Sequence, residues 1–340
     1  MNSTAPIRFG VIGAGRIGKL HAANLAACIP GAQVTAIADP NYQAACDLAA
    51  QLRGPQATPD YRAILQDPSI DAVAICSSTD THAAILIEAA RAGKHIFCEK
   101  PIAYDLARID AALAAVEQAG VLLQIGFNRR FDPNFKKVRD LVAAGQVGKP
   151  HIVRITSRDP APPPIEYVKV SGGLFFDMTI HDFDMARYLL GAEVEEVFAT
   201  GGVLVDPRIG EAGDIDTAVV TLRFQNGAIG VIDNSRRAVY GYDQRVEVFG
   251  SDGVLMVANE TPDRLTCGDA AGMHSAKPHY FFLERYTRSF VDEMKQFVDC
   301  VRQGCVPPVT GQDGRIPVVM AMAATRSLRE NRPVKLCEVE

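Results

Sequence analysis

The sequence predicts an α/β protein with two domains. Residues 1–125 are expected to form a doubly wound parallel sheet, and residues 126–340 an α/β domain with an open, largely antiparallel sheet. The first expectation rests on short apolar runs that alternate with helical patterns, which is typical of a parallel sheet covered on both faces. The second rests on strands after about residue 150 in which apolar and polar residues alternate. A length of 340 residues also fits about two domains.

The apolar runs of the first domain predict strands at 7–12, 33–38, 72–76, 95–98 and 121–125, and helices at about 16–28, 41–51, 81–91 and 105–118. The last of these helices has the clearest boundaries, because Asp105 can cap its start and Gly120 follows its end. Continuous apolar strands separated by helices predict that both faces of this sheet are buried.

In the second domain, strands are expected near 151–156, 194–202, 217–224, 228–233 and 244–249. Two helices close the chain, one over 279–303 with a long apolar seam and one over about 312–330, and they are candidates to pack back on the first domain. The proline-rich segment 159–164, DPAPPP, predicts a stiff extended loop, because proline is excluded from the interior of a sheet.

Composition excludes several classes of protein. A formal net charge of −5 argues against a partner such as nucleic acid or an anionic membrane, which normally requires a basic patch. No apolar run approaches the roughly 18 residues that cross a bilayer, and the first six residues, MNSTAP, do not resemble a signal peptide. The eight cysteines are scattered without a CxxC pair, which predicts reduced thiols and a cytoplasmic protein.

Residues 13–18, GAGRIG, place three glycines directly after the first strand and at the start of a helix. Gly13 permits a tight turn, Gly15 lets the backbone approach a pyrophosphate, and Gly18 allows the helix to pack closely on the strand. Asp39 stands at the end of the second strand, 21 residues beyond Gly18, where a carboxylate binds the adenosine ribose. The pattern predicts a dinucleotide site, and the alternative is a glycine-rich turn that begins an ordinary helix.

Asp39 favours NAD over NADP. A 2′-phosphate a few ångströms from a carboxylate is repelled by about 1–4 kcal/mol. Residues 40–43 supply no Lys or Arg to offset this repulsion, and Arg16 is the nearby cation that could do so.

A polar stripe crosses the otherwise apolar segment 172–191, GGLFFDMTIHDFDMARYLLG. Asp177, His181 and Asp184 stand at i, i+4 and i+7, which is one face of an α-helix. Ionisable groups in apolar surroundings cost several kcal/mol unless they are paired, ligated or used. The stripe is therefore a candidate site.

The chemistry of a dehydrogenase fits these residues. Oxidation of a secondary alcohol requires a base for the hydroxyl proton while hydride leaves for nicotinamide C4, and histidine, with an unperturbed pKa of about 6.5, is the usual base. Lys100 follows the strand at 95–98, at the edge of the sheet where ligands bind, and its ammonium would stabilise alkoxide charge. Asp177 could orient the imidazole of His181 or bind a substrate hydroxyl, and Asp184 could do either on the other side.

Other interpretations stay open for these residues. Lys100 could be an ordinary solvated lysine, and His181 a core histidine held by its flanking aspartates. Asp177 and His181 could instead chelate zinc or iron in a metal-dependent hydrolase or isomerase, although no further His or Cys cluster stands close in sequence. A nucleotide-binding sensor or scaffold without enzymatic activity is the remaining class.

The chain resembles the glucose–fructose oxidoreductase and inositol dehydrogenase (Gfo/Idh/MocA) family over essentially its whole length. The resemblance is carried by the strings GAGRIGKLH (13–21), STDTH (78–82), FCEKP (97–101), GFNRRFDPNF (126–135), ITSRDP (155–160), SGGLFFDMTIHDFDMARYLLG (171–191), NSRRAVYGYDQRVEVFGSDG (234–253) and DGR (313–315). It implies a Rossmann domain followed by an α/β domain whose open sheet makes the contacts of a homotetramer.

The resemblance also implies roles for individual residues. Lys100, Asp177 and His181 would be the catalytic trio, with His181 as the acid/base. The polyol pocket would be lined by Asn128, Arg129, Asp159, Asp184 and Tyr242. The residues expected to touch the cofactor are Gly13, Ala14, Gly15, Arg16, Ile17, Gly18, Asp39, Ser77, Ser78, Thr79, His82, Glu99 and Lys100.

The expected reaction is NAD-dependent oxidation of the axial secondary hydroxyl of myo-inositol to 2-keto-myo-inositol. Scyllo-inositol, glucose and another aldose are alternative substrates, because Met178 stands where some relatives have Thr, and Ser157 and Asp159 stand where they carry His and Asn. A pocket of Asn, Arg, Asp, Tyr and Lys favours a polyol, since such a site discriminates between arrangements of hydroxyls. Arg129 and Arg130 leave a sugar phosphate or sugar acid open. The hypothesis requires Lys100 and His181 to converge on one carbon of the substrate.

Overall fold

The computed structural model describes residues 5–339, and the chain divides into two compact units. Unit 1 contains the residues up to Asn128 together with Arg288–Ile316, and unit 2 contains Arg129–Thr287 and the residues from Pro317 onward. Within residues 5–339, none of the helices is both long enough and apolar enough to cross a bilayer.

The sheet of unit 1 is parallel and doubly wound, as the sequence predicts. Its six strands lie in the order β3-β2-β1-β4-β5-β6. Their bounds are β1 (Ile7–Ile12), β2 (Ala32–Ala38), β3 (Gln56–Thr58), β4 (Ala72–Ile75), β5 (His95–Glu99) and β6 (Leu123–Gly126). The strand order reverses between β1 and β4, and in such sheets ligands bind outside the carboxyl ends of the strands at this reversal.

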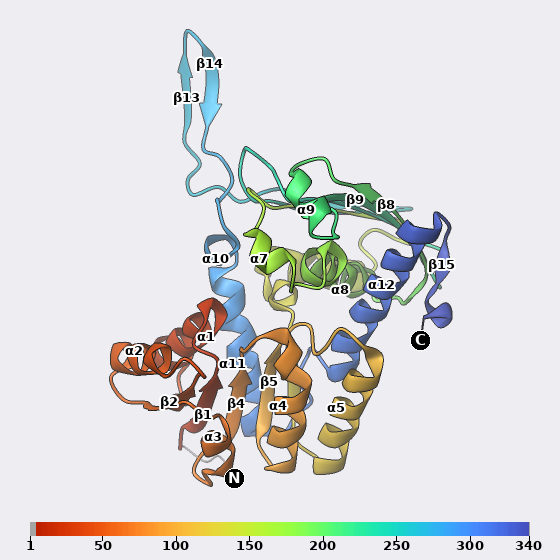
Figure 1. Ribbon diagram of the computed structural model, residues 1–340. Helices are drawn as coiled ribbons and strands as arrows, with labels where there is room; N and C mark the ends of the chain where they lie inside the picture. The colour runs from red at the N-terminus through yellow and green to blue at the C-terminus, as the bar shows by residue number, and fades with distance from the viewer. Residues whose placement is uncertain (1–4, 340) are drawn as a thin grey trace. The chain divides into compact units, whose positions relative to one another are not determined.

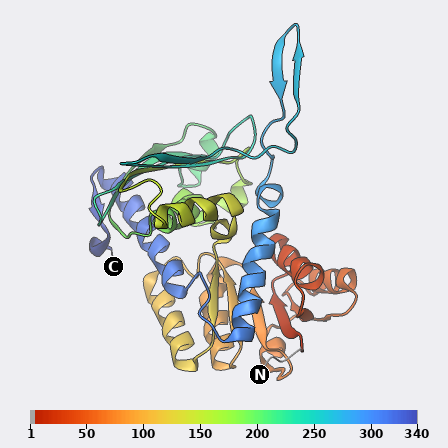
Figure 2. The same ribbon diagram turned by 180° about the vertical axis from the view of Figure 1, so that it is seen from behind.

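Helices cover both faces of this sheet. They are α1 (Arg16–Ala27), α2 (Tyr42–Leu52), α3 (Arg62–Gln66), α4 (Thr79–Arg91), α5 (Leu106–Ala119) and α11 (Thr287–Gln303). Figures 1 and 2 show α4 and α5 on one face and α11 on the other. Phe297 of α11 packs edge-on against Phe9 and tilted against Phe97, with ring centroids 6.1 Å apart in each pair, so the late helix completes a core begun by the first strand.

The prediction of a single helix over 279–303 was wrong at its start. The chain forms a short α10 (Phe282–Arg285), leaves helical geometry at Tyr286 with φ of −111°, and begins α11 at Thr287. Arg285 and Tyr286 are buried in unit 2, where Nη1 of Arg285 lies 2.6 Å from the Asp132 carboxylate. The apolar seam read from sequence therefore belongs to two units, and the chain breaks the helix between them.

The sheet of unit 2 has seven strands in the order β12-β11-β7-β10-β9-β8-β15, all antiparallel except the pair β7–β10. The strands are β7 (Pro150–Arg158), β8 (Val194–Gly202), β9 (Thr217–Phe224), β10 (Ile229–Ser235), β11 (Asp243–Gly250), β12 (Val254–Val257) and β15 (Val334–Lys335). The remaining helices are η1 (Asn128–Phe131), α6 (Pro133–Ala143), α7 (Ile165–Val168), α8 (Ile180–Leu190), α9 (Pro207–Glu211), α12 (Gly311–Glu330) and η3 (Leu336–Glu338).

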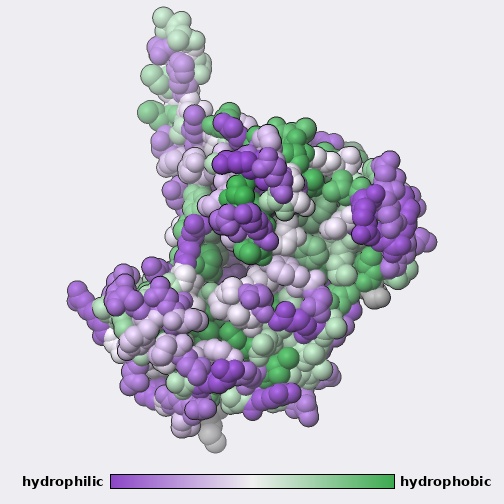
Figure 3. Space-filling view, in the orientation of Figure 1, coloured by the Kyte–Doolittle hydropathy of each residue, from purple (hydrophilic) through white to green (hydrophobic). Residues whose placement is uncertain are grey.

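The helices α6 and α8 pack together over one face of this sheet, whereas the other face exposes apolar side chains. The exposed set includes Val219, Ile229, Phe249 and Met256. A separate ribbon, β13 (Thr266–Asp269) with β14 (Gly272–Ser275), projects from unit 2 (Figures 1 and 2), and Figure 3 shows hydrophobic residues on it among hydrophilic ones.

The segment that carries the polar stripe is not one regular helix. A π-helical turn, η2 (Phe175–Thr179), precedes α8. A π turn closes i→i+5 bonds and holds more residues than an α turn, so Asp177 is rotated away from the face that α-helical spacing predicts. The expectation of a uniform α-helix through Asp177 was therefore wrong in its first turn. Such turns occur frequently at functional sites.

Candidate functional site

The glycine turn after β1 has the geometry of an anion cradle. A Cβ on Gly13, which has φ of 104°, would lie 2.5 Å from the Cys76 carbonyl, and one on Gly18 would lie 1.9 Å from the Gly13 carbonyl. At Gly15, by contrast, a Cβ would meet no atom within 4 Å. Gly15 is also the N-cap of α1, where no side chain caps the helix. The open space at Gly15 and the start of α1 without a side-chain cap fit a pyrophosphate, because the first N–H groups of a helix have no partner within the helix.

Asp39 follows β2 and lies beside this cradle. Its Oδ2 accepts a hydrogen bond of 2.7 Å from the Ala14 N–H, and its Oδ1 accepts one of 2.8 Å from the Asn41 N–H. The two backbone bonds fix the carboxylate next to the glycine turn. This is the place at which a dinucleotide presents its adenosine ribose.

The turn from β4 into α4 carries the next predicted cofactor residues. Ser78 caps α4 without a side-chain hydrogen bond, and Oγ of Ser77 lies 2.7 Å from Oγ1 of Thr81. His82 is 1% exposed, and its ring nitrogens lie 2.8 Å from the Pro101 carbonyl and 3.0 Å from the Ser77 carbonyl. His82 therefore joins this turn to the loop that contains Lys100.

Lys100 follows β5 directly and is partly exposed. The neighbouring Glu99 does not point outward: its Oε1 lies 2.7 Å from Nε2 of the fully buried His21. A Cβ on Gly126 would come within 3.0 Å of the Glu99 carboxylate, so the glycine makes room for it. The role of Glu99 as a cofactor contact stays a prediction, and the structure shows that its contact with His21 anchors the residue directly before Lys100 to α1.

In unit 2, two arginines from η1 are paired with aspartates of α8. Nη1 of Arg129 lies 2.6 Å from Asp182, with side chains 6% and 0% exposed. Arg130 holds both oxygens of Asp184, at distances of 2.6 to 3.1 Å. Oδ2 of Asp182 also accepts a hydrogen bond of 2.8 Å from Asn234 of β10. These residues of η1, α8 and β10 therefore form a layer of charge-assisted bonds, which are stronger than neutral ones.

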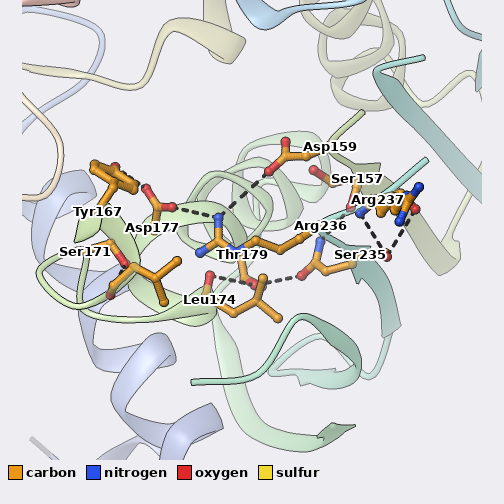
Figure 4. Close-up of polar contacts among 12 residues, drawn as sticks. Ser157, Asp159, Tyr167, Ser171, Leu174, Asp177, Thr179, Ser235, Arg236 and Arg237 are labelled. Carbon is orange, nitrogen blue, oxygen red and sulfur yellow. Dashed lines mark hydrogen bonds and ion pairs between the residues drawn. The ribbon is translucent and has the colours of Figure 1, made fainter. Parts of the chain in front are cut away.

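Asp177 and Asp159 meet at a third arginine, Arg236, as Figure 4 shows. Nη1 of Arg236 lies 2.9 Å from Asp177 and 3.9 Å from Asp159. The hydroxyl of Tyr167 donates to the other oxygen of Asp177, at 2.8 Å. Desolvation raises the pKa of Asp159 to about 6, against the opposing effect of Arg236, and the charge of Asp177 adds to the rise.

Tyr242 and Ser157 lie close to this layer. The Tyr242 hydroxyl is 3.4 Å from Nη2 of Arg129, and Ser157 Oγ is 3.5 Å from the same nitrogen. Burial raises the pKa of Tyr242 well above its ordinary value, so it stays a neutral donor. Asn128 is 5% exposed in η1, and His181 is half-buried in the first turn of α8.

Unit 2 thus brings together Arg129, Asp159, Asp177, Asp184 and Tyr242 as one polar layer, and unit 1 brings the glycines, Asp39 and Lys100 to the carboxyl edge of its sheet. Sequence reasoning missed Arg236, Asp182 and His21. Two signals for them were present in the sequence. Arg236 stands in the string 234–253 and His21 in the string 13–21, both of which carry the family resemblance. Among residues 5–339 no group of three or more His, Cys, Asp or Glu side chains is arranged to hold a metal ion.

A parallel sheet with a glycine cradle after β1 and an acidic residue after β2 defines unit 1 as a dinucleotide-binding domain of the Rossmann class. Residues 7–127 match the family described as "Oxidoreductase family, NAD-binding Rossmann fold", and residues 135–256 match the GFO/IDH/MocA C-terminal domain. The chain belongs to the GFO/IDH/MocA family of oxidoreductases, which confirms the resemblance.

Similar proteins cover the whole chain. The myo-inositol 2-dehydrogenase of Thermotoga maritima is 53% identical over 98% of this chain and 99% of its own. The inositol 2-dehydrogenase of Rhizobium meliloti is 45% identical over 97% and 99%. Among solved structures, scyllo-inositol dehydrogenase from Lactobacillus casei with bound NAD(H) and scyllo-inositol has a TM-score of 0.92 and 30% identity, covering 98% of this chain and 99% of that one.

Proposed function

We propose that this protein oxidises a neutral cyclic polyol with NAD, and that the substrate is myo-inositol, oxidised at its axial hydroxyl to 2-keto-myo-inositol. The pairing of the arginines supports a neutral substrate. Arg129 and Arg130, which left a phosphate or acid open in the sequence, each hold a buried carboxylate. An anionic substrate would have to compete with those carboxylates, whereas hydroxyls can donate to the aspartates of the layer.

The roles proposed for the catalytic residues follow from their chemistry. His181 accepts the proton of the reacting hydroxyl, and Lys100 stabilises the alkoxide as it forms. Asp177 orients one of these groups or the hydroxyl itself. NAD, when bound, takes up the hydride released by the carbinol carbon. That Lys100 of unit 1 and His181 of unit 2 act on the same carbon is part of this proposal.

The cofactor preference is supported by Asp39. Its carboxylate is fixed by Ala14 and Asn41. Ribose hydroxyls can donate to it, whereas a 2′-phosphate would be repelled by about 1–4 kcal/mol. The names of the similar proteins also support inositol as substrate: one is a myo-inositol 2-dehydrogenase of Thermotoga maritima, and another is a scyllo-inositol dehydrogenase crystallised with NAD(H).

The test is a substrate panel followed by NADH absorbance. It compares myo-inositol, scyllo-inositol, glucose, another aldose and an inositol phosphate, each with NAD and with NADP. We expect the highest kcat/KM for myo-inositol with NAD and little turnover of the phosphate. Turnover of glucose or scyllo-inositol above myo-inositol would replace the substrate while keeping the reaction. Binding of NAD without turnover of any polyol would indicate a sensor, and loss of activity with a chelator would indicate a metal-dependent enzyme.

A cytoplasmic homotetramer remains the expected state of the protein. The exposed apolar residues Val219, Ile229, Phe249 and Met256 support self-association, because apolar side chains exposed on a sheet face are covered when that face packs against another copy. Light scattering on the purified protein measures the assembly directly. A monomer at micromolar concentration would contradict the expectation.

A further inference from the structure

Arg236 is the hub of an ionic cluster in the predicted substrate pocket. It follows β10 directly, and its backbone N–H donates to the Asp216 carbonyl at 2.8 Å. The side chain is 2% exposed and faces three carboxylates: Asp177 at 2.9 Å, Asp159 at 3.9 Å and Asp214 at 3.9 Å. Figure 4 shows Asp159 and Asp177 reaching its guanidinium from different directions.

The backbone places Arg236 and Asp159 together. The Asp159 N–H donates to the Ser235 carbonyl at 2.9 Å, and the Ala238 N–H donates to the Asp159 carbonyl. These bonds clamp the end of β7 to the segment that carries the arginine. Asp177 arrives from η2 and is held from its other side by Tyr167. Two carboxylates from different elements are thus fixed on one cation.

The charge balance shows what the arginine does for the acids. Burial opposes the charge of Arg236, but Asp177 and Asp159 outweigh burial and raise the pKa of the guanidinium. Arg236 in turn lowers the pKa of Asp159, which desolvation and Asp177 raise. Without this cation, neighbouring carboxylates would repel one another in desolvated surroundings, which favours protonation of one of them.

The bonding of the guanidinium does not fit a structural role alone. Its Nε and Nη2 donate no hydrogen bond to any group in the described part of the chain, residues 5–339. Buried donors in native proteins are nearly always satisfied, so donors without a protein partner call for an explanation other than saturated bonding within the fold. The interactions of the Arg236 side chain are therefore mainly ion pairs with the surrounding carboxylates, and only part of its hydrogen-bonding capacity is used within the described residues.

We propose that Arg236 is a positioning residue, which holds the carboxylates of Asp159 and Asp177 side by side so that they accept hydrogen bonds from hydroxyls of the ring substrate. This inference rests on the proposed polyol dehydrogenase activity. It assigns to Arg236 no contact with the reacting carbon. The groups that face it are the three aspartates, with Tyr167 behind Asp177, and Arg129 and Asp182 act on Asp159 from farther away.

The experiment compares Arg236→Met, which removes the charge, with Arg236→Lys, which keeps it. Arg237→Met is the matched control, because Arg237 is the exposed neighbour on the same segment. We measure kcat and KM for the polyol as functions of pH, and the affinity for NAD. In Arg236→Met we expect kcat/KM to fall about 100-fold, as for a misplaced binding group. The acid limb of its pH profile, the pH range in which kcat/KM falls on acidification, should shift to higher pH by about one unit or more.

The charge-keeping variant separates positioning from folding. Arg236→Lys should keep the acid limb near that of the parent while recovering only part of the rate, and all three variants should bind NAD like the parent. An Arg236→Met protein with parental kcat/KM and an unmoved limb contradicts the proposal. The proposal is also contradicted if Arg236→Met and Arg236→Lys lose kcat/KM equally while the acid limb stays in place. That outcome would indicate a structural role.

A readout without turnover keeps the two proposals distinguishable. Infrared titration of the carboxylic C=O band, assigned with Asp159→Asn, follows the protonation of Asp159 in each protein. If the parent oxidises no polyol, the proposed function fails, and the infrared shift in Arg236→Met still decides whether Arg236 controls Asp159. If Arg236→Met does not fold, it is combined with Asp214→Asn, and an unshifted titration of Asp159 in that protein overturns the proposal.

Discussion

Nε2 of His21 lies 2.7 Å from Oε1 of Glu99, and this contact joins helix α1 to the last residue of β5, directly before Lys100. On the other side of Lys100, Nδ1 of His82 from α4 lies 2.8 Å from the Pro101 carbonyl. Two buried histidines therefore hold the residues before and after Lys100. The helices that supply them are also the helices whose first turns border the proposed cofactor site, so we expect cofactor binding and the position of Lys100 to be coupled.

Replacing His21 tests this arrangement. In His21→Phe the ring still fits between Phe97 and Phe290, whose centroids lie 4.8 and 5.8 Å away, but Glu99 loses its partner. We expect kcat to fall about 10- to 100-fold, because small displacements of a catalytic group have effects of this size. Steady-state kinetics measure the change. His151→Phe, on an exposed histidine of β7, is the control, and a parental kcat in His21→Phe would show that Glu99 needs no such anchor.

Glu293 of α11 predicts an unusual pH dependence of stability. The side chain is fully buried, and neither carboxyl oxygen has a hydrogen-bond partner within residues 5–339. Burial, and secondarily the charge of Glu99, raise the pKa of Glu293 well above its ordinary value. Its contribution to stability is therefore fully present below the unfolded pKa of 4.5 and is lost as pH rises toward the folded pKa, by about 1.4 kcal/mol for each pH unit.

Glu293→Gln imitates the protonated acid at every pH. We expect it to increase the free energy of unfolding at pH 8, with the gain shrinking to near zero at pH 4.5. Denaturant titrations at several pH values measure the difference. Glu117→Gln, on the exposed side of α5, should change little. A constant difference between parent and Glu293→Gln across this range would mean that the carboxyl is ionised in the folded protein.

The proposed cofactor site of unit 1 could be predicted from sequence because its signals are local. The glycine turn, the helix that follows it and Asp39 lie within a single βαβ unit, so spacing along the chain determines spacing in the structure. The short elements β3 and α3 were not predicted, because three to five residues carry too little periodicity to be recognised.

The proposed substrate pocket of unit 2 could not be predicted to the same depth. Arg129 pairs with Asp182, 53 residues away, and Arg236 with Asp177, 59 residues away. Such pairs are determined by strand order and side-chain direction, which a single sequence does not contain. The apolar pattern of 172–191 correctly predicted burial but not the π turn, which moves Asp177 toward Arg236 and leaves Asp182 to meet Arg129. Asp182 itself fell between the chosen stripe positions.

Replacing Asp39 tests the basis of cofactor choice. Asp39→Ser removes the carboxylate but keeps a short acceptor near the Ala14 and Asn41 N–H groups. We expect the KM for NADP to fall about tenfold or more, in line with loss of a repulsion of about 1–4 kcal/mol, and the KM for NAD to rise. Asp47→Ser, on the exposed face of α2, serves as the control. Unchanged preference in Asp39→Ser would place the discrimination elsewhere.

Asp159 predicts the position of the acid limb of activity. Desolvation raises its pKa to about 6, so the carboxylate is mostly ionised above that pH and becomes a neutral acid below it. A protonated Asp159 has lost acceptor capacity for a substrate hydroxyl, so kcat/KM should fall as pH drops through about 6. Other groups of the pocket can contribute to the same fall in activity, and replacement of Asp159 isolates its share.

Asp159→Asn keeps one acceptor oxygen and cannot titrate. We expect a lower kcat/KM at pH 8, by about tenfold for one weakened hydrogen bond, and a pH profile whose fall near pH 6 is reduced or lost. Asp263→Asn, in an exposed loop, should leave both the rate and the limb unchanged. An unchanged fall in activity near pH 6 in Asp159→Asn would assign this titration to another residue of the pocket, and Arg236 would then have to act through Asp177 alone.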